Sequence, residues 1–234
     1  MSDGIKRFYK EAAAQKVAGG FGLTLDGRTY KTPAESAFVL PTQAMAQAVA
    51  AEWNAAGDKI FPDQMPITTH ANTAIDRVIP QRADVVKELV GYAGTELLCY
   101  RAADPAALVD RQKAEWDPLL AWACDAKGLT FKLAEGILHV AQPEQTLAQA
   151  TALLTAMSDF ELAALFTLIT VTGSFTAGIA VHDGHITAAQ AFEICHLDEL
   201  YQAHVWGTDA EAEDRRKGIV VALEKAAEFL TFCH

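Results

Sequence analysis

The stretch LAALFTLITVTGSFTAGIAVH, residues 162–182, decides the fold class of this chain. It contains no Asp, Glu, Lys or Arg, and its length approaches the roughly 20 residues of a membrane-spanning helix. Threonines interrupt the apolar residues, and Glu161 and Asp183 flank the stretch where a span usually has a basic cytoplasmic anchor. We therefore predict no membrane insertion but two buried helices, broken near Gly173.

Signals for helix starts are frequent around this stretch. The capping pattern Ser/Thr-x-x-Glu/Gln, in which the cap and the third residue satisfy each other's amide groups, begins at Ser158, Thr187 and Thr208. These starts and the apolar spacing predict helices near residues 106–127, 144–157, 159–172, 174–182, 188–206 and 210–231.

The expected helix 188–206 carries several charged residues. Its apolar residues at a spacing of three and four should face the core: Ile194, Leu197, Leu200 and Tyr201. That orientation turns Glu193, Asp198 and Glu199 toward solvent or a cleft.

The first forty residues are typical of β structure. Residues 21–25 alternate in polarity, Asp26-Gly27 is a strong two-residue hairpin signal, and residues 28–31 supply the returning strand. Residues 38–40 predict a third strand.

A helical pattern follows the predicted strands. Met45, Val49 and Trp53 recur every four residues, and Gly57 ends the helix. This spacing places Trp53 in the core, with an exposed partner anchor as the alternative.

Pro80 divides the next helical pattern into two short helices, residues 68–79 and 83–92. Taken together, the patterns predict an α+β fold. A small β-rich N-terminal domain, residues 1–85, precedes a larger all-helical C-terminal domain, residues 86–234.

The charge balance disfavours a nucleic-acid partner. The chain has 19 Lys and Arg against 30 Asp and Glu, a net charge of −11, which repels phosphate backbones. No Lys or Arg occurs between Lys132 and Arg215, and this acidic region favours a basic partner unless it is simply solvated surface. The excess of charge makes a monomer the expected free state.

No pattern in the sequence predicts catalysis. The phosphate-loop pattern is absent, Glu193-x-x-His196 has no second copy with which to build a metal site, and Ser174 is not in a G-x-S-x-G turn. Cys195 neighbours His196 on a helix, where adjacent side chains diverge. We therefore predict no catalytic residue, metal or cofactor, and a binding protein rather than an enzyme.

Several stretches together resemble the assembly chaperones that hold the free α subunit of rotary ATP synthase in mitochondria and alphaproteobacteria. The similarity extends from residue 6 to about 230 and is carried by residues 6–10, 19–28 with 31–33, 51–53, 65–66 with 71–76, 97–101, 116–120, 197–199 and 206–207. None of these is a chemical motif alone, but their order follows the whole chain.

The resemblance implies an ATP-independent chaperone that binds the unassembled α subunit and prevents its aggregation before assembly with β. Glu199 is the first candidate for partner contact, since it belongs to the motif 197–199 and to the region without Lys and Arg. The other candidates for partner binding are Asp198, Glu193 and Trp206, and those for a structural or partner-binding role are Trp53, Arg101 and Trp116.

Two alternatives remain open at this stage. One is a small-molecule enzyme with an acidic pocket between its domains, and the other is an acidic adaptor for another basic protein. The four cysteines are widely spaced, and the N-terminus is charged and does not resemble a signal or transit peptide. These features predict a location in the bacterial cytoplasm, or in the mitochondrial matrix for a mature organellar form.

Overall fold

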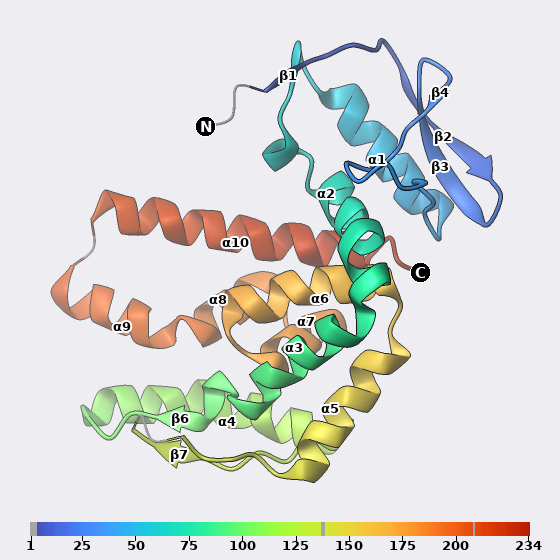
Figure 1. Cartoon of the computed structure of the whole chain (residues 1–234). Coiled ribbons are helices and arrows are strands. Elements are labelled where there is room, and N and C mark those ends of the chain that lie inside the picture. Colours follow the sequence, from blue (N-terminus) through green and yellow to red (C-terminus); the bar gives the residue numbers. More distant parts are fainter. Residues whose placement is uncertain (1–3, 137–138, 208) are drawn as a thin grey trace. The chain divides into compact units, whose positions relative to one another are not determined.

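The computed structural model describes residues 4–136, 139–207 and 209–234 (Figure 1). Packing divides the chain into two compact units. Unit 1 contains the residues up to Arg82 together with 159–164 and 228–234, and unit 2 contains residues 83–158 and 165–227. The α+β class is confirmed, whereas the domain boundary after residue 85 stays a prediction.

Unit 1 contains a three-stranded antiparallel sheet in the order β2 (Ala12–Val17), β3 (Gly20–Leu25) and β4 (Arg28–Thr29). Asp26 and Gly27 have φ values of 49° and 79°, so they form the predicted tight hairpin between β3 and β4.

The third strand predicted at residues 38–40 is wrong. Leu40 pairs with Phe21 and Ala37 with Lys31 only through isolated bridges. The next bonding position of β3 on this edge is already taken, because the Leu23 carbonyl accepts from the Tyr30 N–H at 2.9 Å, so residues 38 and 39 do not pair.

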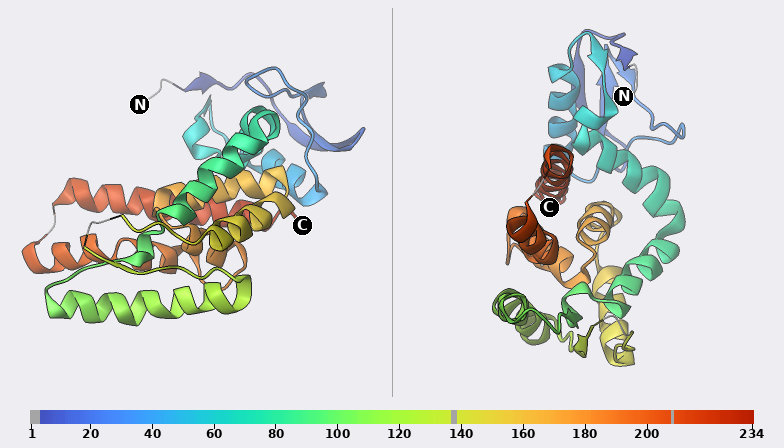
Figure 2. Two further views of the ribbon diagram at one scale, coloured as in Figure 1. Left: turned by 60° about the horizontal axis from the view of Figure 1, so that its bottom comes forward. Right: turned by 90° about the vertical axis from the view of Figure 1, so that its left-hand side faces the viewer.

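Helix α1 (Gln43–Ala55) packs on this sheet (Figures 1 and 2). The Thr42 hydroxyl caps it by accepting a hydrogen bond from the Met45 N–H at 3.1 Å. Trp53, near its end, is 6% exposed and lies in the core against the rings of Tyr9 and Tyr30.

The segment around Pro80 does not contain the predicted interruption between two helices. Helical structure continues from α2 (Pro66–Thr73) through a π turn at Ala74–Val78 and a 3₁₀ turn at Ile79–Gln81 into α3 (Arg82–Gly94). Pro80 lies in the 3₁₀ turn directly after the π turn, so the hydrogen-bond pattern of the helix changes at the residue that has no N–H to donate. The two-residue strands β1 (Ile5–Lys6) and β5 (Lys59–Ile60) pair elsewhere in unit 1.

Helices dominate the second half of the chain, and most begin and end within two residues of the predicted positions. They are α4 (Ala106–Lys127), α5 (Glu144–Ala156), α6 (Asp159–Thr172), α7 (Phe175–His182), α8 (Ala188–Cys195), α9 (Leu197–Trp206) and α10 (Ala210–Leu230). The capping box Thr187–Gln190 is present, whereas Thr208 lies outside the described residues. A short parallel pair, β6 (Tyr100–Arg101) with β7 (Ala134–Glu135), accompanies these helices.

The predicted single helix 188–206 is instead two helices, α8 and α9, separated at His196. His196 has φ −101° and ψ 17°, outside the helical range. Its ring stacks on Phe192 at 4.5 Å, and its Nδ1 lies 3.2 Å from the Phe192 carbonyl oxygen. The same carbonyl also accepts the helical bond from the His196 N–H at 2.9 Å, so α8 keeps its last helical bond and the break lies in the backbone angles of His196.

The break predicted near Gly173 is confirmed. Gly173 has φ 72°, and the Ser174 hydroxyl caps α7 by accepting from the Ala177 N–H at 3.0 Å. Within the described ranges, no helix combines the length and apolar character that a bilayer span needs.

Gly178 allows α6 and α7 to approach closely. A Cβ at this position would overlap Cγ1 of Ile169 on α6. We expect Gly178→Ala to lower the free energy of unfolding by about 1–3 kcal/mol, as overpacking does. Gly91→Ala is the matched control, because Gly91 lies in α3 with nothing within 4 Å of its added Cβ and should be stabilised by up to about 1 kcal/mol. Urea denaturation of both variants measures the difference, and equal stabilisation would contradict close packing at Gly178.

Candidate functional site

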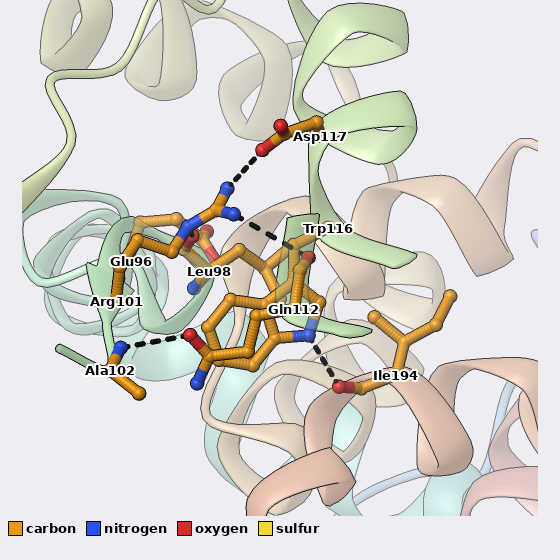
Figure 3. Close-up of polar contacts among 8 residues, drawn as sticks. All are labelled: Glu96, Leu98, Arg101, Ala102, Gln112, Trp116, Asp117 and Ile194. Carbon is orange, nitrogen blue, oxygen red and sulfur yellow. Dashed lines mark hydrogen bonds and ion pairs between the residues drawn. The ribbon is translucent and has the colours of Figure 1, made fainter. Parts of the chain in front are cut away.

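A buried glutamine links three segments of unit 2 (Figure 3). Gln112 on α4 is 1% exposed; its Oε1 accepts from the Ala102 N–H at 2.8 Å, and its Nε2 donates to Asp198 Oδ1 at 2.8 Å. Asp198, predicted for partner contact, is therefore half-buried and anchors the first turn of α9 to α4. Gln112 was missed from the sequence, although it lies four residues from both Leu108 and Trp116, at a core position of an otherwise apolar stripe.

Arg101 and Trp116 support the same region from inside. The Arg101 Nε donates to the Leu98 carbonyl at 2.9 Å, and its Nη2 forms an ion pair with Asp117 at 2.6 Å. The guanidinium lies 5.3 Å from the centre of the Trp116 ring. Trp116 is 2% exposed and donates from Nε1 to the Ile194 carbonyl at 2.8 Å, as Figure 3 shows. Trp116 thus holds α8 against α4, and Arg101 packs on Trp116.

A second polar group that the sequence did not reveal is the fully buried Glu96. Its carboxylate accepts hydrogen bonds from the Ser174 hydroxyl at 2.5 Å, from the Thr176 N–H at 2.9 Å and hydroxyl at 3.0 Å, and from the Leu98 N–H at 3.3 Å. Burial raises the pKa of Glu96, and these donors oppose that rise. The carboxylate thereby caps the N-terminus of α7.

Cys99 and Cys195 do not form a reactive centre with Glu96. Burial raises the pKa of the Cys99 thiol to about 12 and also raises that of Cys195, and the nearby Glu96 charge adds to both shifts. A thiol that stays protonated at neutral pH is a poor nucleophile. Among the residues that the structure describes, no three His, Cys, Asp or Glu side chains gather as metal ligands.

Glu199 joins α9 to α10. Its Oε1 accepts from Arg215 Nη2 at 2.6 Å and from Arg216 Nη1 at 3.3 Å. Partial burial favours a higher pKa for Glu199, but the bonds from the two arginines outweigh this effect and lower it. Glu199, the first candidate for partner contact, is thus an ionised carboxylate that already pairs with two arginines of this chain.

Two adjoining cavities lie beside Glu199 between α9 and α10, which run in opposite directions in Figure 1. We call them together the α9–α10 groove. The larger has a volume of about 830 Å³ and the smaller about 420 Å³. The larger is lined by Asp104, Pro105, Leu108, Glu199, Tyr201, Gln202, Ala203, Val205, Trp206, Gly207, Asp209, Ala212 and Arg216. The smaller is lined by Phe192, Leu200, Glu213, Arg216, Lys217, Val220 and Val221.

Large apolar side chains on the groove are exposed to solvent. Trp206 is 81% exposed, Val205 54% and Val221 53%. The carboxylates of Asp104, Glu199, Asp209 and Glu213 also line the groove, and its cations are Arg216 and Lys217. An apolar surface with a charged border is typical of a site that binds another protein.

The structure brings together part of the residue set predicted for partner contact. Glu199 and Trp206 line the groove, and Asp198 lies one residue before Glu199 with its carboxylate bonded to α4. Glu193 is exposed on α8 and lines neither cavity. Of the apolar residues expected to face the core, Leu197 is buried, whereas Ile194, Leu200 and Tyr201 are half-buried.

The polar clusters described above are internal supports, and the exposed feature of unit 2 is an apolar groove. This arrangement defines a protein-binding protein. A family model described as "ATP12 chaperone protein" matches residues 6–124. This chain therefore belongs to the ATP12 chaperone family, which confirms the resemblance to assembly chaperones of ATP synthase.

Solved structures extend the similarity over the whole fold, including the helices of the groove. The crystal structure of Atp12 from Paracoccus denitrificans has a TM-score of 0.94 and 37% identity, covering 98% of this chain and 99% of that one. A point variant of P. denitrificans Atp12p has a TM-score of 0.94 and 36% identity, covering 98% of each chain. An Agrobacterium tumefaciens protein described as a candidate chaperone has a TM-score of 0.93 and 38% identity, covering 98% of this chain and 86% of that chain.

Proposed function

We propose that this protein binds the unassembled α subunit of ATP synthase and prevents its aggregation until α pairs with β, without ATP and without a catalytic step. The observation that carries the proposal is the α9–α10 groove with its exposed Trp206, found in a member of a chaperone family. A subunit made before its partner exposes apolar interface, which aggregates unless another surface covers it.

The groove suits a chaperone that must later release its partner. Trp206 and the valines offer apolar area without a deep enclosed pocket. The carboxylates at its border add attraction to basic groups on the partner, and attraction between exposed charges weakens as salt concentration rises. We place this activity in the bacterial cytoplasm, or in the mitochondrial matrix for an organellar form, and propose a monomer as the free state.

Trp206→Ala tests the groove. Because Trp206 is 81% exposed, we expect the free energy of unfolding to change by less than about 0.5 kcal/mol. Loss of an interface tryptophan typically costs about 2 kcal/mol or more, so binding to isolated α subunit should weaken roughly thirtyfold. Titration of labelled α subunit measures the affinity, and light scattering of aggregating α subunit without ATP measures protection.

Leu133→Ala is the matched control for this variant. Leu133 is 55% exposed in unit 2 but lines neither cavity of the groove, so its variant should protect like the wild type. Full protection by Trp206→Ala would remove the groove from the partner interface, and a strict need for ATP would contradict the proposed function itself. Glu199 is a less specific probe, because its substitution also removes the ion pairs that join α9 to α10.

A further inference from the structure

The N-terminal motif of residues 6–10 contains a large aromatic side chain, Phe8, that lies mostly outside the core. Arg7 donates from Nη1 to the Ala56 carbonyl at 2.5 Å, from Nη2 to the Lys10 carbonyl at 2.8 Å and from Nε to the Tyr9 carbonyl at 3.1 Å. Tyr9 is 6% exposed, and its hydroxyl donates to the Trp53 carbonyl at 2.6 Å. Phe8, between Arg7 and Tyr9, is 68% exposed.

The bonds on both sides hold Phe8 in a defined place. The Arg7 N–H donates to the Asp58 carbonyl at 2.9 Å, and the Lys10 N–H to Asp26 at 3.0 Å. The Phe8 ring also meets the Tyr9 ring edge-on, with 5.5 Å between the centres. A large aromatic side chain presented by a rigid backbone loses little conformational freedom on binding, which is a property of interface anchors.

The charge around Phe8 is opposite in sign to the acidic region of unit 2. Lys6 and Lys10 flank Phe8 and are exposed. The carboxylate of Asp26 lies close, but it accepts hydrogen bonds from the backbone N–H groups of Lys10 and Glu11. Residues 4–41 contain six basic and three acidic residues. A complementary surface would therefore combine an apolar pocket with carboxylates.

We propose that Phe8, with Lys6 and Lys10, is a second docking point for the unassembled α subunit and inserts into an apolar pocket bordered by carboxylates. This inference rests on the proposed function and adds a contact on unit 1 to the groove on unit 2. Two linked contacts bind more tightly than either alone, because the second forms within the complex already made by the first. A chaperone can thus hold its partner firmly through two individually weak surfaces.

The test compares Phe8→Ala with Ile79→Ala in the full-length protein. Ile79 is 50% exposed in unit 1, so both variants remove an exposed apolar side chain. We expect both to unfold at the wild-type temperature. Phe8→Ala should bind isolated α subunit at least about tenfold more weakly, whereas Ile79→Ala should bind as the wild type does.

Charge reversal tests the carboxylates of the pocket. The double variant Lys6→Glu, Lys10→Glu should bind the α subunit more weakly, and its binding should depend less on salt concentration. Lys16 is an exposed lysine on β2, and Lys16→Glu should change neither property. If the double variant binds the α subunit as tightly as the wild type does, the proposed carboxylates around the pocket are ruled out.

The outcomes separate this inference from the proposed function. If the wild type binds α subunit and Trp206→Ala weakens that binding while Phe8→Ala does not, the second docking point is overturned and the proposed function stands. If the wild type does not bind α subunit, both are overturned.

Discussion

Replacing Glu96 by alanine is expected to lower the free energy of unfolding by about 3–5 kcal/mol. The change removes the acceptor of four hydrogen bonds, so the buried donors of Ser174, Thr176 and Leu98 lose their acceptor. Each unsatisfied buried donor costs about 1–3 kcal/mol. Burying the carboxylate is itself unfavourable, which is why the pKa of Glu96 is raised. The substitution removes this cost, so the net loss of stability is smaller than the sum of the four lost bonds.

Two companion variants separate the causes of this loss. Glu96→Gln retains one carbonyl oxygen as acceptor, so it should lose clearly less stability than Glu96→Ala. Glu88→Ala removes an exposed carboxylate from α3 and should shift stability by less than about 0.5 kcal/mol. Guanidinium denaturation followed by far-ultraviolet circular dichroism measures all three. A Glu96→Ala protein as stable as Glu88→Ala would show that the carboxylate does not hold α7.

Trp53→Ala should also cost about 3–5 kcal/mol, the usual loss for truncating a large buried aromatic. Trp53 is 6% exposed, and its Nε1 donates to the Thr68 hydroxyl at 3.2 Å. Its ring lies 5.4 Å from Tyr9 and 5.0 Å from Tyr30, centre to centre, so its removal leaves a cavity between α1 and the sheet residues.

The matched control for Trp53→Ala is Trp206→Ala, because the same substitution at an 81% exposed tryptophan removes little buried area. Thermal unfolding of the two variants should therefore separate clearly, with only Trp53→Ala melting at a lower temperature. Unchanged melting of Trp53→Ala together with lost binding of α subunit would instead make Trp53 part of the partner interface.

Carboxylates from other segments cap the starts of two helices in this fold. Glu52 on α1 accepts from the N–H groups of Ile67 and Thr68, at 2.7 and 2.8 Å, in the first turn of α2. Glu96 has the same role for α7. An acceptor supplied from a distant segment satisfies the free N–H groups of a helix start and complements its dipole. Glu52 belongs to residues 51–53, one of the stretches that carry the family resemblance, so that stretch has a structural role.

Elements that depend on short-range patterns could be predicted from the amino-acid sequence. The paired buried helices α6 and α7, the turn at Asp26-Gly27 and the ends of α4 all follow from apolar spacing, glycine conformations and caps within a few residues. The class of the protein was also readable, because the motifs of the resemblance follow the whole chain in order.

Elements whose partners are distant in sequence could not be predicted from local patterns. Strand β2 has the sequence AAAQKV, whose Ala, Gln and Lys favour helix, yet it pairs along its whole length with β3 and packs against α1. At the break between α8 and α9, the Ile194 carbonyl accepts from Trp116 and the Asp198 carboxylate from Gln112, both on α4, and apolar spacing does not reveal such distant partners.

The candidate site was predictable only in part for the same reason. The sequence singled out Glu199 and Trp206, but a run without Lys or Arg gives no sign that Arg215 and Arg216 fold back onto Glu199. Phe8 looks like a core residue in the sequence, and only its 68% exposure in the structure shows that it is not. Exposure and ion pairing depend on which distant segments meet, and only the folded chain brings those segments together.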